Sequence, residues 1–236
     1  MSMLVIFLAS LLTASWGAPC QDWLNSHLLQ PLDLVWASRS LPAKKRAPQP
    51  GRILWLDLET SGLDEREHKP LEVAMVVTDE KLNILQAFQS VPHWSQAELN
   101  TMSSFAKEAH TKSGLLEYVA RSSKSWGQVK AEMLQFLKLH FAGEIETRKA
   151  IMMAGNSNHF DLRFLRFHHS EFASHLSHSL GDVSALRNLL RTFKGVEFQK
   201  EYPHRAMDDV LNSIQELSTY LSILNKGLDS MPADGD

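Results

Sequence analysis

Three short apolar segments, each bounded by turn-forming residues, constrain the fold of this chain most strongly. They are residues 52–58 (RILWLDL), 71–78 (LEVAMVVT) and 84–91 (ILQAFQSV). Short apolar runs between turns are typical of buried β-strands, because a strand covered on both faces needs no polar side. Residues 79–83 (DEKLN) have turn chemistry, so the second and third segments are expected to pair as antiparallel neighbours.

Segments with helical periodicity follow these strands. Ser125 and Gln128 form a capping-box pattern, and the apolar residues after them recur at the spacing of an amphipathic helix. The later elements expected are a strand over 149–154, a helix that carries Leu162, Leu165 and Phe167, a helix over 182–193 with Leu186, Leu189, Leu190 and Phe193 inside, and a helix over 205–224. Strands followed by alternating helices and strands predict an α/β fold with a mixed sheet flanked by helices.

Net charge narrows the kind of partner this chain can bind. The 236 residues carry a formal net charge of −3. Proteins that grip long nucleic acid by many phosphates are usually basic, so this balance argues against a binder of long duplexes. It is compatible with an enzyme that holds a few nucleotides and uses bound metal ions as its positive charge. The single cysteine, Cys20, excludes an intrachain disulfide and a Cys-based zinc cluster.

The beginning of the chain differs in composition from the rest. Residues 3–12 (MLVIFLASLL) are apolar and are followed by small residues at 13–18, as in a secretory signal peptide, although no Lys or Arg precedes Arg39. Residues 19–49 hold two acidic and four basic side chains, as in an organellar transit segment. A wrongly chosen start codon or a disordered leader explains the pattern equally well.

These features divide the chain into three predicted regions. They are a leader over residues 1–50 that is removed or disordered, a folded domain over 51–225, and a disordered tail over 226–236. The leader favours a mitochondrion or another organelle, with the secretory route and the cytoplasm as alternatives. Its apolar run is too short for a comfortable membrane span, so no membrane segment is expected in the mature form.

Acidic residues follow two of the predicted strands. Asp57 and Glu59 are two apart on one strand, so their carboxylates point to the same face. Two anions this close repel each other unless a cation lies between them, and a hard divalent metal suits carboxylate ligands. Asp161 falls in the first turn of a helix that follows another strand. The alternatives are a solvated strand end for the pair and an ordinary helix-start carboxylate for Asp161.

The last predicted helix adds an acid and a histidine. Its apolar stripe consists of Val210, Ile214, Leu217 and Leu221. At about 100° per residue, Asp209 lies on the flank of this stripe and faces the protein, whereas Asp208 faces solvent. His204 precedes the helix on a loop, from which its ring can turn towards the same site as Asp209. A lone histidine there would more often be a surface or capping residue.

Four segments carry a resemblance to a known family. Residues 56–64 (LDLETSGLD), 155–165 (GNSNHFDLRFL), 182–184 (DVS) and 204–210 (HRAMDDV) stand in the order and approximate spacing found in oligoribonucleases. These are exonucleases with three Asp, one Glu and a catalytic His on an RNase H-like fold. The resemblance, which runs from about residue 54 to 220, implies a mixed five-stranded sheet flanked by helices.

The resemblance also implies an activity and its cofactors. Asp57, Glu59, Asp161 and Asp209 would hold two Mg²⁺ or Mn²⁺ ions, and His204 would be the general base that takes a proton from the attacking water. The reaction would release 5′ mononucleotides from the 3′ end of short single-stranded RNA. Members of the family are homodimers, in which part of the substrate site crosses the interface.

Five further positions match or replace substrate contacts of the family. Leu63 matches a leucine that wedges between two bases, and Phe105 stands where the family has a stacking Trp. Ser157 and Ser184 match residues near the 5′ phosphate of the substrate. His178 stands where the family has a Tyr, and we expect it to contact substrate as a partial substitute for a missing cation; an ordinary loop histidine is the alternative.

That missing cation is an arginine of the family, which Ser179 replaces here. Ser cannot supply the bidentate charged contact with which arginine caps the 5′ phosphate of a dinucleotide. One alternative is therefore a general DNA or RNA 3′-to-5′ exonuclease with a relaxed length preference. The other is a non-catalytic nucleic-acid-binding relic, whose signature would be the loss of an acid or the histidine. All five are present.

Overall fold

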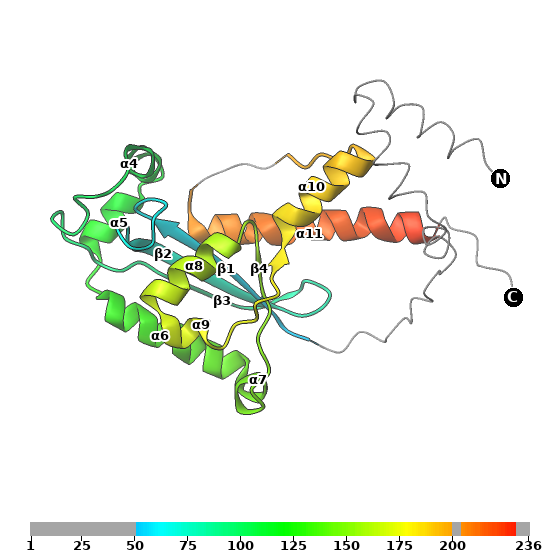
Figure 1. Ribbon diagram of the computed structural model, residues 1–236, viewed down its shortest axis with the longest axis horizontal. Helices are drawn as coiled ribbons and strands as arrows, with labels where there is room; N and C mark the ends of the chain where they lie inside the picture. Colours follow the sequence, from blue (N-terminus) through cyan, green and yellow to red (C-terminus); the bar gives the residue numbers. More distant parts are fainter. Residues whose placement is uncertain (1–50, 200–203, 230–236) are drawn as a thin grey trace, which may run out of the picture. The chain divides into compact units, whose positions relative to one another are not determined.

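The computed structural model describes residues 51–199 and 204–229, and its strands form one sheet (Figure 1). The strands are β1 (Ile53–Thr60), β2 (Pro70–Thr78), β3 (Ile84–Ser90), β4 (Met153–Gly155) and β5 (Gly181–Asp182). Their order is β3-β2-β1-β4-β5, with β1 antiparallel to β2 and parallel to β4. The predicted mixed five-stranded sheet is thereby confirmed. The predicted leader over residues 1–50 lies outside the described residues.

Helices connect and cover these strands. They are α4 (Ser104–Lys112), α5 (Leu115–Arg121), α6 (Trp126–His140), α7 (Ala142–Glu146), α8 (His159–His168), α9 (Ser170–Ala173), α10 (Val183–Lys194) and α11 (Ala206–Asp229). The capping box that begins α6 is present as predicted. Helix α11 continues four residues beyond the predicted domain boundary at residue 225. Among the helices of the described ranges, none has the length and apolar character needed to cross a membrane.

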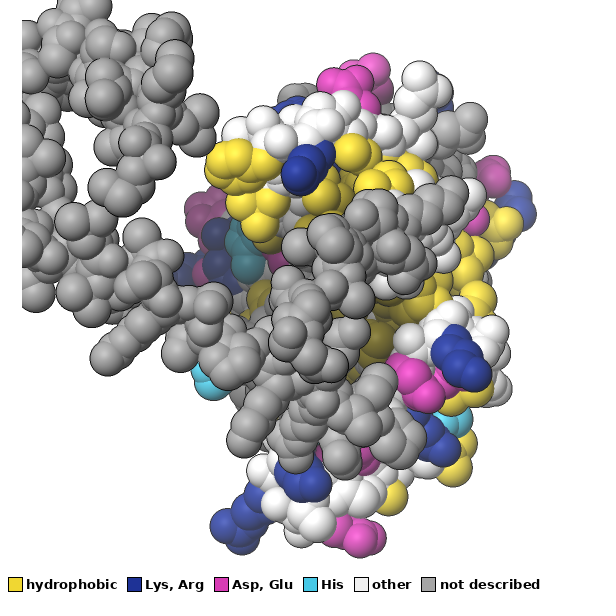
Figure 2. Space-filling model, turned by 90° about the vertical axis from the view of Figure 1, so that its right-hand side faces the viewer, with side chains coloured by type: hydrophobic (Ala, Val, Ile, Leu, Met, Phe, Trp, Pro, Cys, Tyr) yellow, Lys and Arg dark blue, Asp and Glu magenta, His cyan; other side chains and the backbone are white. Residues whose placement is uncertain are grey.

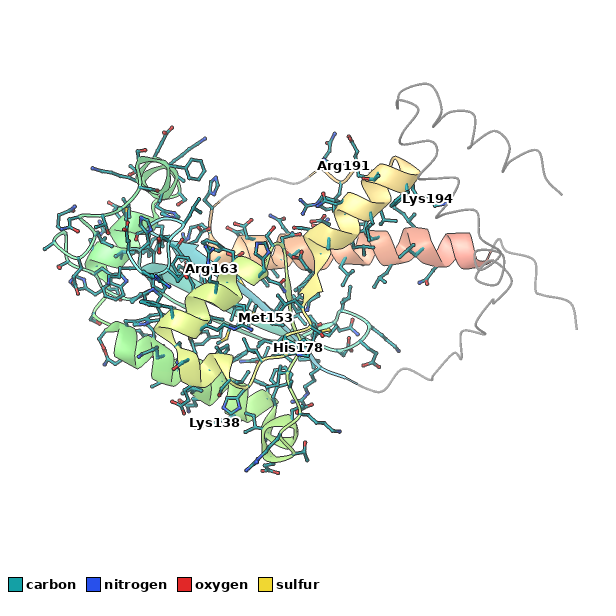
Figure 3. All side chains as sticks on the ribbon, viewed as in Figure 1. Lys138, Met153, Arg163, His178, Arg191 and Lys194 are labelled. Atoms are coloured by element: carbon teal, nitrogen blue, oxygen red, sulfur yellow. The ribbon has the colours of Figure 1, made fainter. Side chains whose placement is uncertain are left out.

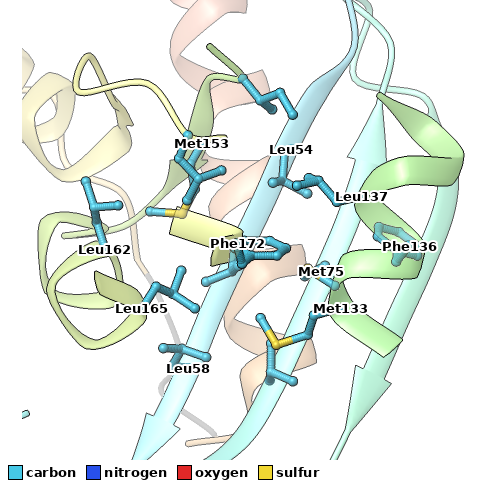
Figure 4. Close-up of a cluster of buried hydrophobic side chains, with 14 of the residues drawn as sticks. Leu54, Leu58, Met75, Met133, Phe136, Leu137, Met153, Leu162, Leu165 and Phe172 are labelled. Carbon is cyan, nitrogen blue, oxygen red and sulfur yellow. The ribbon is translucent and has the colours of Figure 1, made fainter. Parts of the chain in front are cut away.

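The alternation of β1 divides the protein core into two clusters. Leu54, Leu56 and Leu58 face a cluster that α6, α8 and α9 complete, and Figure 4 shows part of this cluster around Leu58 and Phe172. Burial of each such side chain contributes roughly 1.5–3 kcal/mol. Trp55 faces the opposite cluster, which contains residues of α10 and α11. Because side chains alternate along a strand, the acids next on the Trp55 side of β1 face α11.

Two side chains predicted to be internal are exposed. Leu189 and Phe193 of α10 are 56% and 75% exposed. Figure 1 shows the second half of α10 extending away from the sheet, so little of the chain over residues 51–199 and 204–229 packs against its apolar stripe. Only Val183 and Leu190 of α10 are fully buried. Figure 2, viewed from this side, shows hydrophobic side chains on the surface there.

Gly155 allows β4 to end close to β1. Its φ is 157°, and a Cβ at this position would lie 2.9 Å from the backbone oxygen of Leu56. We expect Gly155→Ala to lower the free energy of unfolding by about 2–3 kcal/mol, measured by urea denaturation. Gly143→Ala is the matched control, because its Cβ would meet nothing within 4 Å and it lies in α7. Equal effects of the two substitutions would contradict the close approach.

Candidate metal centre

Two strand residues and one helix residue form an acidic cluster. Asp57 and Glu59 lie near the carboxyl end of β1, and Asp209 lies in the first turn of α11. One carboxylate oxygen from each lies within 4.8 Å of the other two. The cluster arises because β1 presents alternate residues to α11 and α11 turns one flank of its apolar stripe towards β1. The neighbouring Asp208 is exposed.

Burial and charge make this cluster electrostatically unfavourable without a cation. Burial, followed by the nearby charges of Asp209, Glu72 and Asp161, raises the pKa of Glu59 to about 8, while Arg205 opposes the shift. A divalent cation among the carboxylates would reverse this balance, because it favours their ionised forms. The donors are all carboxylate oxygens, which suit hard ions such as Mg²⁺ and Mn²⁺. The residues present therefore fit the metals that the sequence predicted.

Asp161 lies beside the cluster on the first turn of α8. It is 3% exposed, and its Oδ1 accepts a hydrogen bond of 2.9 Å from the backbone N–H of Leu58, the residue between Asp57 and Glu59. Burial raises the pKa of Asp161 to about 7, in spite of hydrogen bonds to the carboxylate that lower it. Asp161 is not one of the three acids within 4.8 Å of one another, and its role as a ligand remains a prediction.

His204 lies at the entrance to α11 in a conformation that histidine rarely adopts. Its φ is 53°, in the left-handed region, which costs a non-glycine residue on the order of 1–3 kcal/mol. Its ring meets the ring of Phe105 edge to face, with centroids 6.2 Å apart. Such strain persists only where the surrounding structure holds the residue in place.

A cavity of about 500 Å³ adjoins the acidic cluster. Glu59 and His204 line it together with Leu63 and Phe105, whose side chains are 74% and 73% exposed. Large apolar side chains held at the surface beside a cavity can stack on nucleic-acid bases. The structure thus places both predicted base-contacting residues at one opening.

The remaining predicted contacts fall in two separate places. Ser157 donates a hydrogen bond of 3.2 Å to Ser184, whose hydroxyl donates to Asn156, so these residues form one network after the carboxyl end of β4. His178 follows Ser177, whose backbone N–H donates a hydrogen bond to the carbonyl oxygen of Ile151 before the amino end of β4 (Figure 3). Within one chain the structure therefore does not bring His178 to the cavity.

Three residues of the site have no assigned role in the sequence prediction, although Arg205 lies in the segment 204–210 that carries the resemblance. Glu72 of β2 and Arg205 form an ion pair beside Glu59. His110 is 2% exposed and lies 3.9 Å from Glu59, and its Nε2 donates a hydrogen bond of 2.9 Å to the backbone oxygen of Thr60. Burial lowers the pKa of His110, which favours the neutral form of the ring. Glu72 could have been suspected of a role in the site, because it is a charged residue inside an otherwise apolar strand.

We expect the metal-free protein to lose stability as the pH rises. A carboxyl with a higher pKa in the folded than in the unfolded state binds more protons when folded, so its contribution is present at low pH. For Glu59 this contribution is lost between the ordinary pKa of 4.5 and the folded value of about 8. The loss should be on the order of 2–4 kcal/mol, measured by thermal unfolding in a chelator at several pH values.

Two controls separate this effect from the titration of other groups. Glu59→Gln should remove most of the pH dependence, because the amide cannot ionise. Saturating Mg²⁺ should flatten the dependence in the unaltered protein, since ligands deprotonate when they bind the ion. If the stability of Glu59→Gln and of the unaltered protein fell equally with rising pH, the pH dependence would come from other groups.

Comparison with known proteins agrees with this arrangement. Residues 54–217 match the family model described as exonuclease (RNase_T). The chain is 38% identical over 173 residues to a probable oligoribonuclease of Dictyostelium discoideum, covering 72% of this chain and 88% of that protein. It is 35% identical to the mitochondrial oligoribonuclease of Mus musculus, covering 72% of this chain and 71% of that protein. For the oligoribonuclease of Vibrio campbellii the identity is 35%, with 74% and 96% covered.

Solved structures share the fold at lower identity. An exonuclease I from Methylocaldum szegediense matches with a TM-score of 0.55 and 16% identity over 72% of this chain and 40% of that one. The E. coli exonuclease I complex with single-stranded DNA matches with a TM-score of 0.57 and 16% identity over 77% and 42%. This chain thus spans less than half of these larger proteins. From residue 54 to residue 217 it has the sequence pattern and the fold of one family: the protein belongs to the exonuclease family that includes the oligoribonucleases.

Proposed function

We propose that this protein is a metal-dependent 3′-to-5′ exoribonuclease that degrades short oligoribonucleotides to 5′ mononucleotides. The observation that carries the proposal is the position of the acidic cluster, Asp57, Glu59 and Asp209, beside a cavity with two exposed apolar side chains. Its relatives at 35–38% identity bear the name oligoribonuclease, which supports short RNA as the substrate.

Asp57, Glu59 and Asp209, with Asp161 beside them, would hold two Mg²⁺ or Mn²⁺ ions. Bound divalent ions would supply positive charge at the scissile phosphate and increase the acidity of water. The protein's own contribution is to hold the carboxylates in place before the ions arrive, on a strand and a helix that pack against each other.

The other residues would position the substrate and move one proton. Leu63 and Phe105 would contact the bases at the mouth of the cavity. His204 would accept a proton from the attacking water, a role that imidazole side chains often have in enzymes. Ser157 and Ser184 would contact the 5′ phosphate through their hydroxyl groups.

The exposed stripe of α10 supports a homodimer. Leu189 and Phe193 would be covered by a second copy of the chain, which could also bring His178 near the partner's substrate. We expect Phe193→Glu to weaken self-association by at least about a hundredfold, measured by sedimentation, because a buried Phe contributes roughly 1.5–3 kcal/mol in each protomer. Leu139→Glu is the matched control on α6, where the leucine is 72% exposed. A protein that stays monomeric before mutation would contradict the dimer.

Turnover against chain length tests the proposal. Purified protein with Mg²⁺ or Mn²⁺ would be given labelled RNA and DNA strands of two to ten nucleotides, with Asp57→Asn as the inactive control. Release of mononucleotides mainly from the shortest RNA is expected. Equal rates on longer strands and on DNA would favour a general exonuclease, consistent with Ser179 in place of the family arginine. Binding without any cleavage would favour a non-catalytic relic.

A further inference from the structure

A second buried carboxylate lies beside the acidic cluster. Glu72 of β2 stands opposite Glu59 in the β1–β2 register, so both side chains project from the same face of the sheet. The side chain of Glu72 is fully buried. A buried anion next to three other acids requires partners of its own.

Neighbouring side chains and one backbone N–H donate hydrogen bonds to the Glu72 carboxylate. Its oxygens accept hydrogen bonds from Nε and Nη2 of Arg205 at 3.1 and 2.8 Å, from the backbone N–H of Ala206 at 3.0 Å, and from Gln89 at 2.7 Å. The guanidinium of Arg205 also lies over the ring of Tyr118, 4.8 Å from its centroid. Arg205 therefore pairs with the charge of Glu72 beside the metal-binding acids.

The same contacts fix the beginning of α11. Ala206 is the first residue of the helix, and the Glu72 carboxylate accepts its N–H as a cap supplied by a distant strand. Arg205 accepts the first helical hydrogen bond through its carbonyl, from Asp209. The two residues after His204 are thus held by one buried carboxylate.

We propose that the Glu72–Arg205 ion pair is a positioning device for His204. The left-handed backbone of His204 is followed directly by two anchored residues, so the backbone that carries the imidazole cannot shift without disturbing the ion pair. The ring of Tyr118 also limits the movement of the Arg205 guanidinium. Neither Arg205 nor Glu72 lines the cavity, so both act through His204. This inference rests on the proposed role of His204 as the base.

Three variants test the device in the full chain. Arg205→Leu removes the positive charge and keeps an apolar side chain. Glu72→Gln removes the buried negative charge. Arg205→Lys keeps a positive charge at this position. Val129→Ala, in α6 on the other face of the sheet, is a control for lost stability. For each variant, kcat, KM, Mn²⁺ affinity and the His204 imidazole signal in NMR spectra would be measured.

The device predicts a specific pattern. At saturating Mn²⁺, used because both charges also act on Glu59, Arg205→Leu and Glu72→Gln should lower kcat by about a hundredfold with KM within about threefold, and should shift or broaden the His204 signal. Arg205→Lys should keep most of the rate. Equal losses of kcat in Val129→Ala at matched stability, or an unchanged His204 signal in both charge variants, would overturn the inference. A chain that cleaves no oligonucleotide before mutation would overturn the proposed function instead, and the His204 signal would still report on the positioning.

Discussion

Asp209→Asn is expected to abolish turnover while the protein remains folded. The substitution replaces one of the three clustered carboxylates by an amide, which is a weaker ligand for a hard cation. A loss of at least about a thousandfold in kcat corresponds to roughly 4 kcal/mol of transition-state stabilisation. The metal-free variant should unfold at the same temperature as the unaltered protein or higher, since Asp209 raises the pKa of Glu59 by repulsion.

Asp208→Asn is the matched control for this prediction. It changes the same charge one residue away, on a side chain that is exposed. Its kcat should stay within about twofold of the unaltered protein, because exposed charges distant from the reaction have small effects. Single-turnover assays with a labelled dinucleotide, together with Mn²⁺ titrations, would compare the two variants. Comparable losses in both would contradict the orientation of α11.

The second large effect is expected from His204→Ala. General bases contribute about 10²–10⁴-fold to rates, so kcat should fall within that range. Metal affinity should persist, because His204 is not one of the acids that form the cluster. This combination distinguishes the histidine from Asp209, whose substitution should weaken metal binding as well.

A second substitution refines the test of His204. Unchanged kcat in His204→Ala would assign proton removal to another group. His204→Gln is the control for lost packing, because the glutamine keeps a polar side chain against the ring of Phe105.

Regular periodicity explains why the sheet and several helices could be predicted. The first three strands have apolar runs with clear turns, and α6 begins with a capping box, so local sequence determines each of them. Helices α4 and α5 were not predicted. The fully buried residues of α4 are Ala106, Ala109 and His110, which form no strong apolar stripe. Strand β4 is shorter than the predicted 149–154 because Ile151 makes only an isolated bridge.

The site shows a similar division between local and distant information. The strand period places Asp57 beside Glu59, and the helix period separates Asp209 from Asp208, so these placements follow from spacing alone. The pairing of Glu72 with Arg205 joins residues 133 positions apart, and one sequence gives no signal for it. The exposure of Leu189 and Phe193 was likewise missed, because a helical stripe indicates an apolar contact without saying which chain supplies it.

Manganese anomalous diffraction tests the central claim most directly. Crystals of the full chain soaked in Mn²⁺ would be compared with crystals of Asp57→Asn treated in the same way. The account predicts anomalous peaks among the carboxylates of Asp57, Glu59 and Asp209, absent or weakened in the variant. Peaks confined to other parts of a protein that still cleaves short RNA would contradict it.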